Sequence, residues 1–220
     1  MKAGDLTKAL YRNRFGQQHS NRDLVWKVLC EDFFCHYIKS HDVVLDVGGG
    51  HCEFINNILC SRKLVLDINE DTKAFARSEV EVYCQSAIDS WPFLERSVDV
   101  VLCSHFFEHL PSKKAVLIVL ENARKVLRPN GRLLVLSPNI RYTSKEYWDF
   151  FDHYVPLSHV SMEEALKVVG FEVERIIPRF LPYSMKDWYP KFPILIRTYL
   201  RLPLLQSLMG KQMFIVAKKP

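Results

Sequence analysis

Short apolar runs alternate with amphipathic stretches along most of this chain. The runs hold five to seven residues, are rich in valine, leucine and isoleucine, and predict β-strands. They cover residues 43–47, 63–67, 80–84, 98–103, 132–136, 171–177 and 213–217. Helical patterns cover residues 52–59, 71–78, 112–127 and 161–170. This alternation predicts an α/β fold built on a mainly parallel sheet.

Residues with known positional preferences set the limits of the predicted helices. Ser112 is a candidate N-cap for the helix that runs to about Leu127, and the turn-forming residues 128–131 stop that helix. Ser161 is the candidate N-cap of the next helix, and Gly170 closes it. The near-continuous apolar run at 98–103 predicts a strand that is covered on both faces.

A length of 220 residues and a hydrophobic content of 48% predict a single domain with a sizeable core. We expect its parts to be an N-terminal helical cap (1–40), a core (41–177), a basic helical lid or insertion (178–211) and a last strand (212–220). The insertion is the irregular part, because four prolines interrupt it between residues 179 and 210.

Neither a signal peptide nor an apolar run of about 20 residues is visible, so a cytoplasmic protein is expected. The six cysteines form no Cys-x-x-Cys pair, and several lie within apolar runs. This pattern predicts free thiols in a reducing compartment, with neither a disulfide framework nor a metal site. The sequence carries no signal for oligomeric state.

Positive charge gathers at the C-terminal end. Residues 175–220 carry a net charge of +8, which leaves about −3 for the rest of a chain whose total is +5. Three interpretations stay open: a basic lid packed on the domain, a lid over an anionic acceptor such as a nucleotide or lipid diphosphate, and peripheral membrane contact through residues 192–211. Nucleic acid is disfavoured, because no binding module and no arginine or lysine run is present.

The stretch VVLDVGGGHCEF (43–54) predicts a strand, a tight glycine turn and a helix start, a device that binds cofactors close to the backbone. Read as the dinucleotide pattern G-x-G-x-x-G, it places Glu53 at the third glycine, where its carboxylate would face a pyrophosphate. Read as D-x-G-x-G-x-G, it matches at Asp46, Gly48 and Gly50, with Cys52 in place of the last glycine. The turn alone leaves both cofactor types open.

The second predicted strand ends in Asp67, 19 positions after Gly48. A carboxylate at this spacing can accept hydrogen bonds from both ribose hydroxyls of an adenosine, which suits either cofactor type. The alternative is an aspartate that only caps the following helix.

The segments VDVVLCSHFFEHLP, LENARKVLRPNGRLLVLSP, SMEEALKVVGFEVERI and QMFIVAKKP, in this order, resemble class I S-adenosylmethionine-dependent methyltransferases. The resemblance implies a three-layer Rossmann-like fold. Its seven-stranded sheet would have an antiparallel last strand and would bind S-adenosylmethionine at the carboxyl edge of the first strands. The cofactor-binding positions implied are Asp46, Gly48, Gly50, Asp67, Ile68, Ser86, Ala87, Ser104 and His105.

These positions match the resembled pattern unevenly. Gly48 and Gly50 would pack against the methionine part, Asp67 would hold the ribose, and Ile68 would touch adenine. The pair Ser86-Ala87 lacks the acid that the pattern often has near adenine, and Asp89 could substitute for it. Ser104 and His105 would line the methionine end.

The resemblance also implies the chemistry. The sulfonium methyl is already activated, so positioning the acceptor can supply much of the rate, and a hydroxyl acceptor would gain from a base. His153 and His159 follow the fifth strand, where acceptors usually bind in this fold. His105 is a further candidate base, as is His109 within FEHLP, although His109 more often orients a loop; a metal site at Glu108 and His109 is disfavoured.

Two segments bear on the acceptor. The aromatic stretch 147–154 could be core or acceptor pocket. The C-terminal segment resembles the ends of methyltransferases encoded with polysaccharide or glycolipid biosynthesis enzymes. We therefore expect methyl transfer to a small-molecule or lipid-linked acceptor, first of all an oxygen of a saccharide. The SHFF at 104–107, where amino-base methyltransferases often carry (N/D)PP(Y/F), disfavours base N-methylation.

Two other function classes stay open. A nicotinamide-dependent nucleotide-sugar oxidoreductase or epimerase is disfavoured by Glu53 and by the lack of a Tyr-x-x-x-Lys pair. A non-catalytic cofactor-binding accessory protein stays possible because the adenine acid and an obvious base are missing.

Overall fold

A seven-stranded sheet forms the centre of the computed structural model, which describes residues 19–183 and 192–220. Its strands are β1 (Val43–Val47), β2 (Arg62–Asp67), β3 (Val80–Cys84), β4 (Val98–Ser104), β5 (Leu127–Pro138), β6 (Glu172–Ile177) and β7 (Gln212–Lys218). Their order is β3-β2-β1-β4-β5-β7-β6, and only β7 runs antiparallel to its neighbours. The predicted sheet, with its antiparallel last strand, is confirmed.

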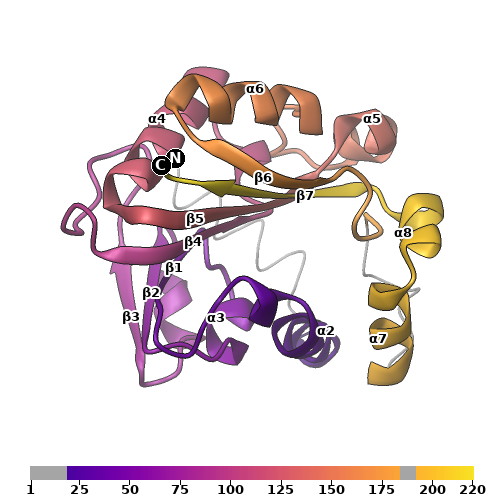
Figure 1. Ribbon diagram of the computed structural model, residues 1–220, viewed down its shortest axis with the longest axis horizontal. Helices are drawn as coiled ribbons and strands as arrows, with labels where there is room; N and C mark the ends of the chain where they lie inside the picture. The colour runs from indigo at the N-terminus through magenta and orange to yellow at the C-terminus, as the bar shows by residue number, and fades with distance from the viewer. Residues whose placement is uncertain (1–18, 184–191) are drawn as a thin grey trace.

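Helices cover both faces of the sheet, which gives three layers (Figure 1). One face carries α4 (Lys113–Val126) and α6 (His159–Val169), and the other carries α2 (His19–Asp32) and α3 (Glu53–Asn57). Helix α7 (Pro193–Arg201) packs against α2. The remaining helical segments are η1 (Phe34–His36), η2 (Glu70–Ala74), η3 (Phe107–His109), α5 (Ile140–Thr143), η4 (Glu146–Asp149) and α8 (Pro203–Met209).

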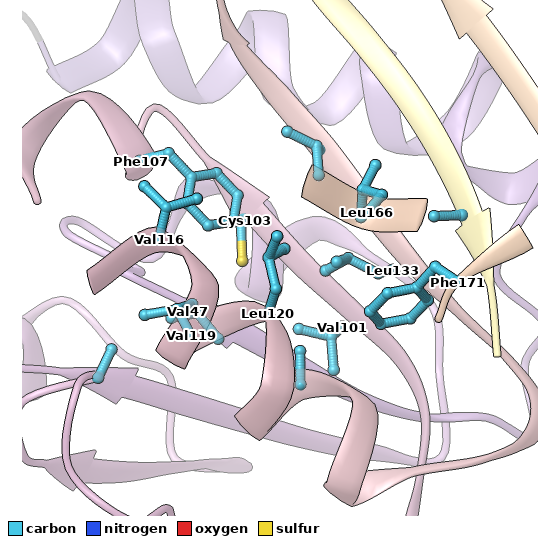
Figure 2. Packing of buried hydrophobic residues seen from close by; sticks show 14 of the residues in the cluster. Val47, Val101, Cys103, Phe107, Val116, Val119, Leu120, Leu133, Leu166 and Phe171 are labelled. Carbon is cyan, nitrogen blue, oxygen red and sulfur yellow. The ribbon is translucent and has the colours of Figure 1, made fainter. Parts of the chain in front are cut away.

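Strand β4 shows why the sheet needs two covering layers. Val101 and Cys103 point into the apolar cluster under α4, whereas Val100 and Leu102 point into the cluster on the opposite face. All four side chains are buried. Figure 2 shows the first cluster, where α4 contributes Val116, Val119 and Leu120. The apolar run at 98–103 therefore has the two buried faces that the sequence predicts.

The second cluster is rich in aromatic rings and ties the N-terminal helical segment to the last strand. Phe33 stacks on Phe180 at 4.3 Å between ring centroids and meets Phe214 of β7 edge-on at 4.9 Å. Tyr37 also contacts Phe214, at 5.4 Å. The segment expected to be a helical cap thus contributes to the core from Val25 on. Residues 1–18 lie outside the described residues.

Several predicted boundaries are corrected by local backbone geometry. Ser158, not Ser161, is the N-cap of α6; Ser161 is the third helical residue and completes a capping box with Ser158. The helix predicted at 52–59 has only five residues, the one predicted at 71–78 is a 3-10 turn, and residues 128–131 already belong to β5. Ser112 does cap α4, by accepting from the Ala115 amide.

Two prolines begin the helices of the predicted helical insertion. Pro193 and Pro203 occupy first-turn positions of α7 and α8, where a missing N–H costs no helical hydrogen bond and the fixed φ favours the helix. The two helices lie beyond the carboxyl edge of the parallel strands (Figure 1). In the part of the chain that the structure describes, no helix has the length and apolarity needed to cross a bilayer.

Replacing Phe214 with alanine tests the aromatic cluster. The side chain is fully buried among four aromatic rings, so the Phe214→Ala variant should lose about 3–5 kcal/mol of unfolding free energy in urea titrations. Leu204→Ala, at a position 83% exposed, is the control and should stay within about 0.5 kcal/mol of the parent chain. Equal losses in both variants would contradict the assigned core.

Candidate functional site

The glycine turn after β1 is built from left-handed backbone. Gly48, Gly50 and Cys52 have φ angles of 75°, 53° and 60°. A Cβ on Gly48 would lie 2.5 Å from the Phe106 ring, so a side chain at this position has no room. Cys52 takes a conformation that costs a non-glycine residue about 1–2 kcal/mol, which explains why the resembled pattern has glycine there. Its side chain is buried, with Sγ 3.7 Å from the carbonyl oxygen of Thr72.

Asp67 fastens the end of β2 to this turn. One carboxylate oxygen accepts from the Gly50 amide and the other from the Asn69 amide, each at 2.8 Å. Burial raises the pKa of Asp67, although these two hydrogen bonds act in the opposite direction. A carboxylate oxygen has more than one acceptor position, so the held group can still receive ribose hydroxyls. Ile68, which the resemblance places against adenine, is 39% exposed.

Three carboxyl groups gather around the turn. Burial, together with the nearby charges of Asp67 and Glu53, raises the pKa of Asp46 well above its usual value. Arg22 of α2 pairs with Glu53 at 3.1 Å between Nε and Oε1 and offsets one of these charges. The remaining negative charge suits a cationic ligand such as a sulfonium with an α-amino group. The sequence predicts Asp46 and Asp67 but not Arg22, because nothing local shows that α2 reaches the turn.

Ser86 and Ala87 follow β3 at the same edge. The Gln85 amide donates to the Asp67 carbonyl at 2.9 Å, which places the pair next to the end of β2. Ala87 is buried, and its carbonyl accepts from the Trp91 indole at 2.8 Å. Asp89 is exposed. The two residues that the resemblance places near adenine therefore lie at the same edge as Asp67, and at position 86 a hydroxyl replaces the acid that the resembled pattern often has.

His105 is held as a neutral ring. Its Nε2 lies 2.9 Å from Oε1 of Gln212, the first residue of β7, and its Nδ1 lies 2.9 Å from the Ser104 hydroxyl. The Gln212 amide nitrogen donates to the Pro182 carbonyl, which leaves Oε1 to accept from Nε2. Burial and then the positive charge of Arg22 lower the pKa of His105 to about 4. Both nitrogens are engaged, so His105 suits positioning better than proton transfer.

His109 and His153 come together from distant parts of the sequence. Their rings lie 5.0 Å apart between centroids, and Glu108 is beside them. His109 Nδ1 donates to the Asp152 carbonyl at 3.0 Å and lies 3.2 Å from the Asp152 carboxylate. Burial lowers the pKa of His109, but the hydrogen bond with Asp152 and the charge of Glu108 outweigh it and raise the value. Burial raises the pKa of Glu108 to about 7.

His159, the third histidine predicted as a base, has different partners. Its Nδ1 lies 2.9 Å from the side-chain amide of Asn139, and its ring stacks on Tyr142. Partial burial and then the charge of Arg141 lower its pKa. His109 and His153 are therefore brought together, whereas His159 has separate contacts near the start of α6.

The aromatic stretch 147–154 divides between the core and the surface. Tyr147 is fully buried and donates from its hydroxyl to the Val155 carbonyl at 2.7 Å. Trp148, Phe151 and Tyr154 are exposed. One ring thus packs in the core, and three lie at the surface beside the His109 and His153 pair.

Several cations of the C-terminal segment have partners within the domain. Arg197 of α7 binds Asp32 and Glu31 of α2, each at 2.8 Å, and Lys211 pairs with Glu146. Arg179 lies over the Tyr142 ring at 4.9 Å. Three cations of the segment predicted as a basic lid therefore contact other parts of the domain: Arg179, Arg197 and Lys211.

Comparisons with known proteins agree with this geometry. Residues 45–135, from β1 into β5, match the family described as "Methyltransferase domain". A curated relative, the ubiquinone/menaquinone biosynthesis C-methyltransferase UbiE of Escherichia fergusonii, is 28% identical over 60% of this chain and 57% of its own length. The chain thus spans less than two thirds of that relative.

Solved structures share the whole fold. A SAM-dependent methyltransferase from Archaeoglobus fulgidus has a TM-score of 0.69 at 23% identity and covers 96% of this chain and 99% of its own. The [4+2]-cyclase SpnF has a TM-score of 0.62 at 16% identity, over 93% and 82%. Because a cyclase shares the architecture, the fold alone does not specify the reaction. The matched methyltransferase domain, together with the turn and Asp67, supports the prediction of an S-adenosylmethionine-dependent methyltransferase.

Proposed function

We propose that this chain transfers a methyl group from S-adenosylmethionine to a lipid-linked acceptor, with an oxygen of a saccharide as the first acceptor atom to test. The cofactor part is supported by the turn, the Asp67 carboxylate and the carboxyl groups around them. When bound, S-adenosylmethionine supplies an activated methyl on a cationic sulfur. The residues of this chain bind it, orient the acceptor and exclude water.

The observation that carries the lipid-linked acceptor is an apolar ridge on α7 and α8. We define the apolar ridge as the exposed residues Phe192, Ile194, Leu195, Leu202, Leu204, Leu205 and Leu208. Soluble proteins rarely expose so many large apolar side chains together unless the surface binds something. The sequence has no acid after Asp187, so no carboxylate here would be repelled by an anionic lipid surface.

The apolar ridge is connected directly to the site. Arg179 donates to the Gly210 carbonyl at 2.7 Å, and Gln212, two residues further on, contacts His105. The Lys211–Glu146 ion pair joins the same segment to the exposed aromatic stretch. A lipid tail on the apolar ridge would therefore leave its head group near His105 and the His109–His153 pair.

A hydroxyl acceptor must lose a proton during transfer. Glu108, His109 and His153 are the polar side chains that we place next to the acceptor hydroxyl, because they converge and His153 adjoins the exposed Tyr154. A saccharide oxygen fits such a polar cluster. The alternative is a carbon acceptor, as in the name C-methyltransferase of the relative UbiE. Product analysis must distinguish methylation of carbon from methylation of oxygen.

Product analysis tests the proposal directly. We expect that incubation with methyl-labelled S-adenosylmethionine and a total lipid extract puts label into the lipid fraction, and that NMR of the product shows an O-methyl group on a sugar. Label on carbon would reject the saccharide oxygen. Absence of label from lipid, with intact cofactor binding, would reject the lipid-linked acceptor and favour a non-catalytic role.

Asp67 should control cofactor affinity. Removing a charged hydrogen-bond acceptor costs about 1.5–3 kcal/mol, so Asp67→Ala should weaken calorimetric binding of S-adenosylmethionine by roughly 10- to 150-fold. Glu70→Ala removes an exposed acid nearby in the chain and serves as the control. An unchanged dissociation constant for S-adenosylmethionine in Asp67→Ala would show that Asp67 does not hold the cofactor.

Cofactor affinity should also fall on acidification. The pKa values of Asp46 and Asp67 are raised, so both groups take up protons at a higher pH than ordinary aspartates and lose the charge that attracts a cation. S-adenosylmethionine should therefore bind more weakly at about pH 5 than at about pH 7. S-adenosylhomocysteine, which lacks the sulfonium charge, should weaken less. Equal pH dependence for both compounds would contradict the electrostatic account.

The apolar ridge should bind lipid vesicles. Burying one leucine side chain is worth about 1.5–3 kcal/mol, so Leu204→Asp and Leu208→Asp should each reduce co-sedimentation with vesicles by at least about tenfold. Leu94→Asp is the matched control, because Leu94 is as exposed as Leu204 but lies just before the amino end of β4. The apolar ridge lies instead beyond the carboxyl ends of the parallel strands (Figure 1). Retained binding in the ridge variants, or equal loss in the control, would reject the ridge as the contact surface.

A further inference from the structure

Three potential metal ligands converge next to the end of β4. Glu108, His109 and His153 each place one ligand atom so that all three lie within 4.8 Å of one another. Glu108 and His153 are buried, and His109 is half-buried. The sequence analysis disfavours a metal site at Glu108 and His109. The fold brings in His153, from the segment before α6, as a third potential ligand.

The backbone holds the two contributing segments together. The Glu108 carbonyl accepts from the Tyr154 amide at 2.8 Å and from the Val155 amide at 3.3 Å. The Tyr147 hydroxyl binds the Val155 carbonyl, and the Phe150 ring stacks on the His153 ring at 4.8 Å. The three ligand atoms therefore meet on a fixed frame.

One carboxylate oxygen of the cluster is buried without a hydrogen-bond donor among the described residues. Oε2 of Glu108 is buried, and it has no hydrogen-bond partner among the residues that the structure describes. The side chain as a whole is only 3% exposed. A buried carboxylate oxygen without a donor is costly, and a cation would satisfy it.

Asp152 supplies the support that a metal-binding histidine usually has. A carbonyl oxygen can only accept, so His109 Nδ1 carries the proton that it donates to the Asp152 carbonyl. The lone pair of the ring is then on Nε2. A carboxylate or carbonyl that receives the other ring N–H of a ligating histidine fixes its tautomer and orientation.

We propose that Glu108, His109 and His153 bind one Zn²⁺-like divalent cation. Two imidazoles and one carboxylate form a donor set of catalytic zinc sites, which leave a further position open. Ligand distances of about 2.0–2.2 Å would bring the ligand atoms about 3.4 Å apart. Because they now lie within 4.8 Å of one another, the cluster would contract by up to about 1.4 Å on binding.

The role of this cation rests on the proposed methyl transfer. The acceptor hydroxyl would occupy the open position, where the cation lowers its pKa and its proton passes to water. The O–CH₃ bond forms as the S–CH₃ bond breaks, and the electron pair of the broken bond stays on sulfur as a neutral thioether. His105 would position the acceptor, because its own nitrogens are engaged.

Zinc titration of metal-stripped protein in reducing buffer tests the site without acceptor or cofactor. We expect calorimetry to show one equivalent of Zn²⁺ bound. Glu108→Gln and His153→Gln should bind at least about 100-fold more weakly, and Asp152→Asn roughly 10- to 100-fold more weakly. His41→Gln, an exposed histidine, and Cys84→Ser, an exposed thiol, are the matched controls and should leave affinity unchanged.

Two measurements on the parent chain keep the test independent of variant folding. Zn²⁺ should raise its melting temperature whereas Mg²⁺, which prefers oxygen ligands, should not. Zinc X-ray absorption should show nitrogen and oxygen ligands without sulfur. Absence of a melting shift, sulfur coordination, or equal affinity in Glu108→Gln would overturn the site. S-adenosylmethionine binding to the same sample reports separately on the proposed function.

Discussion

The hydrogen bond from the Gly50 amide to the Asp67 carboxylate is the interaction on which the site depends. It joins the turn after β1 to the end of β2, so the left-handed backbone at Gly48, Gly50 and Cys52 is held in one shape. The next strand in sequence, β3, lies beyond β2, and β4 follows on the other side of β1. Ligands bind where the strand order reverses in this way, and the turn lies at that point.

The two sides of the site have different electrostatics. Around the turn, buried carboxyl groups favour a cation, and Arg22 neutralises only Glu53. Beyond β4, burial lowers the pKa of His105 and raises that of Glu108, and the hydrogen bond with Asp152 raises the pKa of His109. The proposed reaction, between a positively charged methyl donor and an acceptor that loses a proton, would use these two environments side by side.

The sequence predicted what local patterns encode. Apolar runs located all seven strands, whereas the antiparallel last strand was implied only by the resemblance to class I methyltransferases. Ser112 was a correct cap because its helix starts at the next residue, whereas Ser161 was wrong because a serine three residues earlier completes a reciprocal cap with it. Arg22, Gln212 and the approach of His153 to Glu108 were not predictable, since each depends on which distant elements pack together.

Cofactor binding at the turn after β1 is the claim that an experiment can test most directly. Calorimetric titration of the whole chain with S-adenosylmethionine and, separately, with a nicotinamide dinucleotide tests the central assignment of the turn. The account predicts one equivalent of S-adenosylmethionine bound and no binding of the dinucleotide, because buried Glu53 stands where a pyrophosphate would need a glycine. Binding of the dinucleotide without S-adenosylmethionine would contradict it.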